Sequence, residues 1–158
     1  MRNTIPEALF IPRDVLVEAQ NLARLRAAWA AWLQEREWSH YCTLTFRFAI
    51  SVERATRDFE QFVRRLNKYA DNRIDWASVL ETSPGDLIHL HALVGQTDHL
   101  TVARVEQAWK SGITQIRRYD PRRGAARYMT KAINNRGIEI DVSRTLTAIS
   151  PKAVSYRQ

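Results

Sequence analysis

The chain has 158 residues, of which 45% are hydrophobic and 26% charged, and this composition is typical of one globular domain rather than a disordered chain. The formal net charge is +7, and 20 of the 24 basic residues are arginines, whose forked side chains match phosphate oxygens and favour a nucleic-acid partner. A single cysteine, Cys42, excludes an internal disulfide framework, and no apolar stretch is long enough to span a bilayer. Residues 1–12 lack the layout of a signal peptide, so we expect a cytoplasmic, intracellular protein with no membrane partner.

The apolar periodicity predicts an α+β fold. The expected elements, in chain order, are an N-terminal arm (1–12), an accessory helix (14–37), a strand (40–48), a helix (51–69), two strands (75–81 and 87–94), a helix (101–110), a strand (113–119) and a helix (122–133). The six elements from 40 to 119 follow the strand-helix-strand-strand-helix-strand order of a ferredoxin-like or RRM-like fold, so we expect one antiparallel sheet with helices packed on it. We treat 1–158 as a single domain with a catalytic core at 40–133 and a C-terminal tail at 134–158, which carries little periodic signal.

The accessory helix mixes arginines with tryptophans. Such a mixture can bind single-stranded nucleic acid, because aromatic rings stack on bases while arginines hold phosphates. An amphipathic helix that docks on the core is the simpler interpretation, and we adopt it for Trp29. The role of Trp32 stays open at this point.

His89 and His91 are the first candidate site residues. They stand two positions apart in a predicted strand, so alternation places both imidazoles on one face of the sheet. Two neutral imidazoles side by side can bind one divalent cation, which needs a third ligand to complete its site. Taken alone, the pair is equally compatible with two hydrogen-bonded surface histidines.

Glu81 is the candidate third ligand. If the hairpin closes with a three-residue tip over 84–86, Glu81 lies directly opposite His89 and diagonal to His91, with Cβ atoms roughly 5 and 7 Å away. A four-residue tip would turn Glu81 to the other face, because a shift of one residue flips every side chain. Asp86, in the turn itself, is the alternative ligand.

Tyr128 is the candidate nucleophile. Lys131 follows it by three residues on the predicted helix and therefore shares its face. A tyrosine hydroxyl ionises near pH 10, so it needs a nearby cation to react with a phosphate. Taken alone, Y-x-x-K is more typical of an amphipathic tyrosine on a solvated helix.

Arginines are densest just before and within this predicted helix, which suits a scissile phosphate. The candidate DNA-binding residues are Arg117, Arg118, Arg122, Arg123 and Arg127, together with Arg47 near the end of the first predicted strand.

Three short motifs resemble, in their order along the chain, those of HUH endonucleases of the replication-initiator (Rep) type. They are Tyr41-Cys42-Thr43-Leu44-Thr45-Phe46, His89-Leu90-His91 and Tyr128-Met129-Thr130-Lys131. Together they span residues 41 to 131, most of the chain. One turn beyond Tyr128 stands Ala132, so the resemblance is to single-tyrosine members.

The resemblance implies an HUH endonuclease fold and a reaction on single-stranded DNA or an origin hairpin. It implies that His89, His91 and Glu81 bind Mg²⁺ or Mn²⁺, and that Tyr128 attacks the scissile phosphate with help from Lys131. The products would be a 5′-phosphotyrosine link and a free 3′-hydroxyl that starts rolling-circle replication of a plasmid or phage. No P-loop motif is present, so a separate helicase and polymerase would be partners.

Three other functions remain open on the sequence. One is a single-tyrosine transposase of the same superfamily, and another is a non-catalytic ferredoxin-like module that binds nucleic acid. The third is a metal hydrolase that uses H-x-H to activate water.

Overall fold

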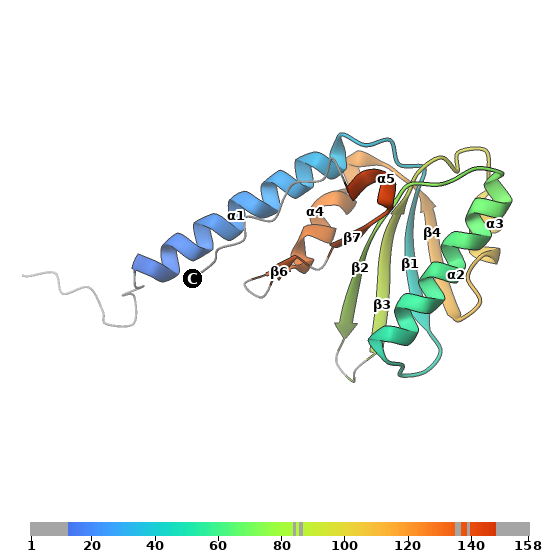
Figure 1. Cartoon of the computed structure of the whole chain (residues 1–158), viewed down its shortest axis with the longest axis horizontal. Helices are drawn as coiled ribbons and strands as arrows, with labels where there is room; N and C mark the ends of the chain where they lie inside the picture. The colour runs from blue at the N-terminus through green and yellow to red at the C-terminus, as the bar shows by residue number, and fades with distance from the viewer. Residues whose placement is uncertain (1–12, 84, 86, 135–136, 139, 148–158) are drawn as a thin grey trace, which may run out of the picture.

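A five-stranded antiparallel sheet with the strand order β4-β1-β3-β2-β7 forms the centre of the molecule (Figure 1). The computed structural model describes residues 13–83, 85, 87–134, 137–138 and 140–147. The strands of this sheet are β1 (His40–Phe46), β2 (Trp76–Ser83), β3 (Leu87–Val94), β4 (Gly112–Arg118) and β7 (Ile140–Val142). The first four have the order and directions of a ferredoxin-like fold, so the predicted α+β class is confirmed.

Helices lie on both faces of this sheet. The α-helices are α1 (Arg13–Gln34), α2 (Val52–Ala70), α3 (Val102–Gln107), α4 (Ala125–Met129) and α5 (Arg144–Thr147). The remaining elements are the 3-10 turns η2 (Pro121–Arg123) and η3 (Thr130–Ala132) and a two-stranded ribbon of β5 (Ile133–Asn134) and β6 (Gly137–Ile138). No helix within the described ranges is both long and apolar enough to cross a membrane.

Helix α2 begins and ends where its local chemistry requires. The Ser51 hydroxyl accepts a hydrogen bond from the Arg54 amide at 3.2 Å, so Ser51 is the N-cap. Asp71 then adopts a left-handed conformation with φ of 53° and ends the helix. Between these ends, one apolar stripe is buried against the sheet: Ala55, Phe59, Phe62, Leu66 and Ala70.

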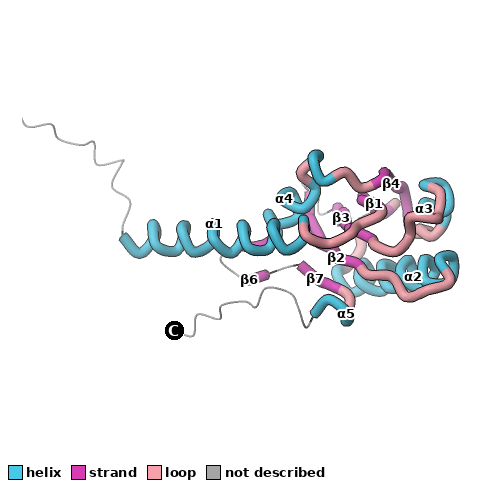
Figure 2. The backbone as a smooth tube through the Cα atoms, turned by 90° about the horizontal axis from the view of Figure 1, so that it is seen from above, coloured by secondary structure: helices cyan, strands magenta, loops and turns pink. Residues whose placement is uncertain are grey.

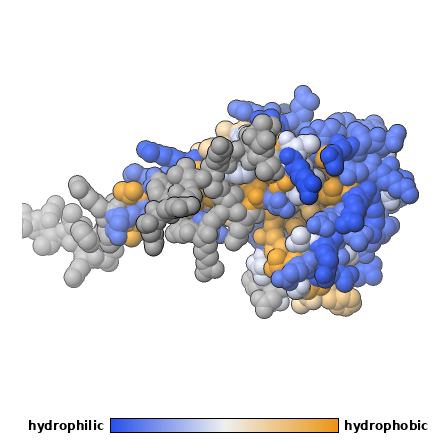
Figure 3. Space-filling view, viewed as in Figure 1, coloured by the Kyte–Doolittle hydropathy of each residue, from blue (hydrophilic) through white to orange (hydrophobic). Residues whose placement is uncertain are grey.

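The sheet separates two hydrophobic cores. On one face, Cys42, Leu44 and their neighbours on the other strands pack under α2 and α3. On the opposite face, Tyr41, Leu93 and Val79 pack under α1 and α4. Figure 2 shows α2 and α3 on the side of the sheet away from α1. In the space-filling view of Figure 3, the α2–α3 side is largely hydrophilic, whereas hydrophobic colour appears over the strands between α4 and α2.

The accessory helix, α1, packs against the segment that carries Tyr128. Trp29, Trp32 and Leu33, near the end of α1, are buried in the same core as the short helix α4. The Arg26 Nε donates a hydrogen bond to the Ile133 carbonyl at 2.8 Å and so ties α1 to the residue that follows η3. Both tryptophans are therefore core residues, and the open question about Trp32 is answered in favour of packing. The first turns of α1 extend away from the sheet (Figures 1 and 2).

The expected helix over 122–133 is wrong in detail. The segment is instead a 3-10 turn, the five-residue α4, a second 3-10 turn and the start of β5. Gly124 causes the first break, because its φ of 72° is a left-handed conformation that no continuous helix contains. The accessory helix also ends at Gln34, three residues earlier than expected.

The C-terminal tail over 134–158, which carries little periodic signal, forms short elements where it is described. β7 extends the main sheet by pairing Ala77 with Val142 and Val79 with Ile140, and α5 follows it. These strands are too short for a periodic signal, because two or three residues cannot establish an alternation. Residues 148–158 of the tail lie outside the described part.

The hairpin between β2 and β3 has the three-residue tip that the sequence analysis required. Ser83 faces Leu87, and Gly85 lies at the tip with φ of 90°, a conformation that glycine adopts without strain. Glu81 consequently lies directly opposite His89, as predicted. Asp86, the alternative ligand, lies outside the described residues.

His40 is a buried titratable group at the start of β1. It has no solvent exposure, and its Nδ1 forms a hydrogen bond with the Thr97 hydroxyl at 2.8 Å. Burial is the main cause that lowers the pKa of His40 from 6.5 to about 4, with a smaller contribution from Arg118 that Asp98 partly offsets. The folded chain therefore resists protonation of His40 over a range in which the unfolded chain accepts it.

We predict that His40→Gln weakens the acid sensitivity of folding. Because the pKa is depressed in the folded state, its contribution to stability is present above pH 6.5 and is lost as the pH falls towards 4. The loss amounts to roughly 3 kcal/mol over this window. The free energy of unfolding, measured with urea at pH 7 and at pH 4.5, gives this loss of stability. His99→Gln, at an exposed histidine, is the matched control and should show the same difference between the two unfolding free energies as wild type. If His40→Gln also shows the wild-type difference, buried His40 is not the source of the acid sensitivity.

Candidate functional site

The two histidines lie on the sheet face that carries α1 and α4, and side chains of β1 orient them. Register places Thr43 opposite His91 and Thr45 opposite His89. The His89 Nδ1 lies 3.1 Å from the Thr45 hydroxyl, and the His91 Nδ1 lies 3.0 Å from the Tyr41 hydroxyl. The Thr43 hydroxyl also lies near the His91 Nδ1, at a longer distance of 3.4 Å. The first and second motifs of the sequence are thus in direct contact.

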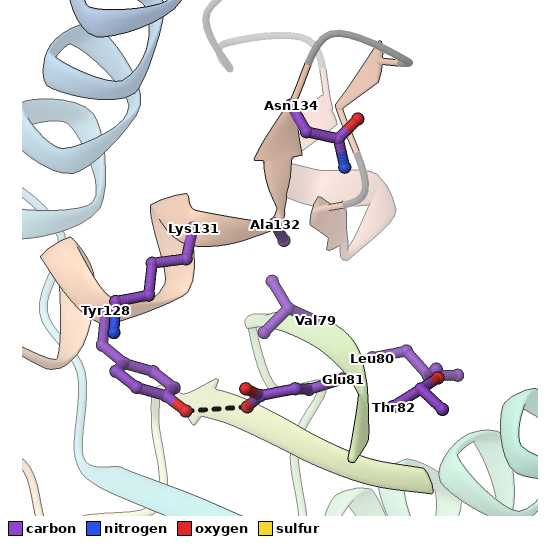
Figure 4. Close-up of a pocket in the computed structure, with 8 residues that line it drawn as sticks. All are labelled: Val79, Leu80, Glu81, Thr82, Tyr128, Lys131, Ala132 and Asn134. Carbon is purple, nitrogen blue, oxygen red and sulfur yellow. Dashed lines mark hydrogen bonds between the residues drawn. The ribbon is translucent and has the colours of Figure 1, made fainter. Parts of the chain in front are cut away.

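Glu81 connects the histidine pair to Tyr128. One carboxylate oxygen, Oε2, accepts a hydrogen bond from the His91 Nε2 at 2.9 Å. The same oxygen accepts a second hydrogen bond, from the Tyr128 hydroxyl, at 2.7 Å (Figure 4). His89 points elsewhere, since its Nε2 lies 3.2 Å from the Ser83 hydroxyl. Glu81 therefore contacts the diagonal histidine and not the one directly opposite. Among the described residues, no three histidine, cysteine, aspartate or glutamate side chains surround one point as a ready-made metal site.

The hydrogen-bond partners define the tautomer of each imidazole. Hydrogen bonds, chiefly from Tyr128, lower the pKa of Glu81, so its carboxylate only accepts and the His91 Nε2 must carry the proton. The His91 Nδ1 then accepts from Tyr41. For His89, the Ser83 hydroxyl donates to the Leu87 carbonyl at 3.1 Å and so accepts from Nε2, which leaves Nδ1 to accept from Thr45.

His89, His91 and Glu81 could bind a divalent cation if both imidazoles changed tautomer. Burial is the main cause that lowers the pKa of His91, so its imidazole is neutral, as a metal ligand must be. A hydroxyl can donate or accept, so Tyr41 and Thr45 can equally serve the tautomer in which Nδ1 carries the proton and Nε2 is bare. Both Nε2 atoms would then be available on the same face as Glu81. The donor chemistry of a two-histidine, one-carboxylate site is present.

Tyr128 is partly exposed and, in this arrangement, firmly protonated. Its hydrogen bond to Glu81 is the main cause that raises the pKa of Tyr128 to about 12, with burial and the Glu81 charge adding to it. The Lys131 Nζ lies 4.5 Å from the centre of the Tyr128 ring, so the predicted shared face is confirmed although the ammonium sits over the ring. The ring also meets the His91 imidazole edge to face at 5.1 Å. The tyrosine hydroxyl is therefore within the histidine–glutamate cluster.

Tyr41 is a site residue that the sequence analysis did not single out. Its ring stacks on His91 with centroids 6.1 Å apart, and the Arg117 guanidinium lies 4.7 Å from the centre of the same Tyr41 ring. It is only 7% exposed, and burial is the main cause that raises the pKa of Tyr41. A signal was present in the sequence, because Tyr41, Thr43 and Thr45 alternate and place three hydroxyls on one face.

The predicted arginine cluster is divided between the two faces of the sheet. Arg117 lies on the histidine face above Tyr41, whereas Arg118 points to the other face and donates to the Asp98 and Leu100 carbonyls, each at 2.9 Å. Arg122 and Arg123 lie near Asp120, at 3.1 and 3.9 Å. The remaining two candidates, Arg127 on α4 and Arg47 after β1, are exposed.

Comparison with known proteins gives one family. The family model described as replication-associated protein ORF2 matches residues 39–136, which include the site and the sheet apart from β7. No curated protein and no solved structure matches the chain significantly. Helix α1 lies outside the matched range. Because the match covers more than half of the 158 residues, the chain belongs to the replication-associated protein ORF2 family.

Proposed function

We propose that the chain is a single-tyrosine endonuclease of the HUH superfamily, which nicks and rejoins single-stranded DNA to start rolling-circle replication. The observation that carries the proposal is the convergence of Tyr128 and His91 on one oxygen of Glu81. A nucleophile, a neutral imidazole and a carboxylate from three separate segments meet there. Membership of a replication-associated family supports the replication role over transposition.

The reaction is a transesterification at one phosphodiester. The Tyr128 oxygen forms a bond to phosphorus, the bond from phosphorus to the 3′-oxygen breaks, and the DNA leaves with a free 3′-hydroxyl. Glu81 already accepts the Tyr128 hydrogen bond and is the base that receives its proton. The proton returns to the 3′-oxygen as that oxygen leaves, so protons balance. Lys131 lies beside Tyr128 and offsets negative charge on the phosphate.

His89, His91 and Glu81 are the residues that would hold Mg²⁺ or Mn²⁺. A bound cation would supply Lewis-acid polarisation of the scissile phosphate. Two imidazoles beside one carboxylate suit Mn²⁺ better than Mg²⁺, which prefers oxygen ligands throughout. A carboxylate has two oxygens, so Glu81 can ligate with one and keep Tyr128 on the other.

A single nucleophile is the favoured arrangement. Ala132 stands one turn beyond Tyr128, and the nearby Tyr41 is buried with its hydroxyl engaged on His91. Tyr41 is therefore a positioning residue for the imidazole and has no path to a phosphate. In the rejoining step, a 3′-hydroxyl would attack the phosphotyrosine and release Tyr128, so no second tyrosine is needed.

DNA contacts are proposed for the arginines around this face. Arg127 is exposed one residue before Tyr128, and Arg117 lies above Tyr41. Arg122 and Arg123 are also exposed to solvent despite Asp120 and can exchange it for phosphate, whereas Arg118 is held by two carbonyls on the far face. Arg47 is exposed directly after β1, two residues beyond Thr45. The substrate would be single-stranded DNA or an origin hairpin, which a separate helicase and polymerase would process further.

We predict that Tyr128→Phe abolishes a covalent adduct that wild type forms. Labelled single-stranded DNA is incubated with the protein and Mn²⁺, and adducts that withstand denaturation are counted on a gel. Loss of the nucleophile should lower the adduct yield at least about a thousandfold. Tyr69→Phe is the matched control, because Tyr69 lies on α2 beneath the Arg104 guanidinium. This variant should form the adduct as wild type does. Cleavage by Tyr128→Phe without an adduct would instead identify a hydrolase that activates water.

We predict that Tyr41→Phe and Thr45→Val each weaken Mn²⁺ binding. Both changes keep the size of the side chain and remove only the hydroxyl that orients an imidazole, a loss that typically costs about 10- to 100-fold in metal affinity. Electron paramagnetic resonance of free Mn²⁺ measures the affinity without DNA. Thr114→Val is the control, because Thr114 lies opposite Leu44 on the other face. Wild-type affinity in both variants would refute the orienting role.

A further inference from the structure

Ser83, the last residue of β2, is hydrogen-bonded to one of the proposed metal ligands. Its hydroxyl lies 3.1 Å from the Leu87 carbonyl oxygen and 3.2 Å from the His89 Nε2. Ser83 and Leu87 are the pair that closes the hairpin between β2 and β3. Because side chains alternate along β2, Ser83 also shares the sheet face of Glu81. The hydroxyl is therefore held between the backbone of the hairpin and an imidazole.

The Leu87 carbonyl decides the direction of the hydrogen bond between Ser83 and His89. A carbonyl oxygen can only accept, so it takes the single proton of the hydroxyl, and the hydroxyl oxygen then accepts from the His89 Nε2. This contact favours the tautomer in which Nε2 carries the proton. The contact at Nδ1 imposes no comparable preference, because the Thr45 hydroxyl can donate or accept there.

A cation and a proton compete for the same position on Nε2. A metal binds an imidazole nitrogen along its in-plane lone pair, which is the direction that the N–H bond takes in the other tautomer. In the arrangement described, the Ser83 oxygen lies in that direction from His89. A cation can therefore reach this Nε2 only after the proton has moved to Nδ1 and the Ser83 hydroxyl has turned away.

The two imidazoles differ in what a cation gains when it breaks the hydrogen bond at Nε2. The His91 Nε2 donates to Glu81, which is itself a proposed ligand, so a cation placed there gains a carboxylate. The His89 Nε2 donates to a neutral hydroxyl whose proton is already engaged on the Leu87 carbonyl. Breaking this second contact loses a hydrogen bond and gains no anionic ligand. The contact with Ser83 thus opposes metal binding.

We propose that Ser83 restrains His89 in the tautomer whose Nε2 cannot bind a cation, and so weakens metal binding at the site. This inference rests on the proposed function and extends it from which residues bind the cation to how tightly they bind it. Ser83 is a positioning residue whose effect on metal affinity is opposite to that proposed for Tyr41 and Thr45. One net hydrogen bond is at stake, which corresponds to a roughly three- to tenfold change in affinity.

Two measurements on the full chain test the proposal, and neither needs DNA. Electron paramagnetic resonance of free Mn²⁺ gives the dissociation constant of the metal. Long-range ¹H–¹⁵N NMR without metal, at about pH 8, where an ordinary imidazole is neutral, reports which nitrogen of His89 carries the proton. The second measurement detects the restraint itself, which a general loss of structure would not imitate.

The variants isolate the hydroxyl of Ser83. Ser83→Ala removes it, and the pair Ser83→Thr and Ser83→Val compares side chains of nearly equal size with and without a hydroxyl. Thr82→Val is the control, because Thr82 lies opposite Ile88 and faces the other side of the sheet. Thermal unfolding followed by circular dichroism verifies that each variant folds, and the Thr and Val pair decides the matter if Ser83→Ala does not.

We expect Ser83→Ala and Ser83→Val to bind Mn²⁺ roughly three- to tenfold more tightly than wild type and to place more of the His89 proton on Nδ1. Ser83→Thr, which keeps a hydroxyl, and Thr82→Val should match wild type in both measurements. Equal or weaker affinity in Ser83→Ala and Ser83→Val, or an unchanged tautomer of His89, would overturn this proposal alone. Wild type that binds no Mn²⁺ would overturn it together with the proposed metal site.

Discussion

The register of β1, β3 and β2 is the constraint on which the whole site depends. Alternation gives each strand one set of side chains per face, so a shift of one residue in either pairing would send a motif to the wrong side. With Thr45 opposite His89 and Glu81 opposite His89, the hydroxyls, imidazoles and carboxylate form three adjacent rows. The three-residue tip at Gly85 sets one of these registers, and the core beneath α2 holds the other, since the alternate residues of β1 are buried there.

The chemistry of the site follows from polar groups whose roles can reverse. A hydroxyl partner accommodates either tautomer of an imidazole, and a carboxylate can hold a tyrosine proton or a cation. In the arrangement described, Glu81 keeps Tyr128 protonated and raises its pKa, which opposes attack on a phosphate. Engagement of the carboxylate by a cation would weaken this hold on Tyr128. The Tyr128–Glu81 hydrogen bond thus keeps the tyrosine protonated and also holds it beside the proposed metal ligands.

Long strands, helix caps and the hairpin were predictable from sequence, because alternation, Ser51 and the turn residues act locally. The confirmed facing of Glu81 and His89 followed from counting residues around one turn. Other features depended on tertiary contacts that no local pattern encodes. Rotamers decide that Glu81 reaches His91 instead of His89, and burial decides that Tyr41 is a partner of His91. The break at Gly124 and the pairing of β7 were missed, since a single left-handed residue and a three-residue strand leave almost no periodic trace.

Helix α1 has a consequence for the boundaries of a minimal active unit. Tyr128, the proposed nucleophile, sits on a helix of five residues, far too short to be stable by itself, and Trp29, Trp32 and Leu33 of α1 complete its core. Yet α1 precedes the range that defines the family, residues 39–136. A polypeptide trimmed to that range would retain all three sequence motifs while uncovering the apolar side of α4. Any shortened form of this chain should therefore keep α1, or replace it with another apolar surface that supports α4.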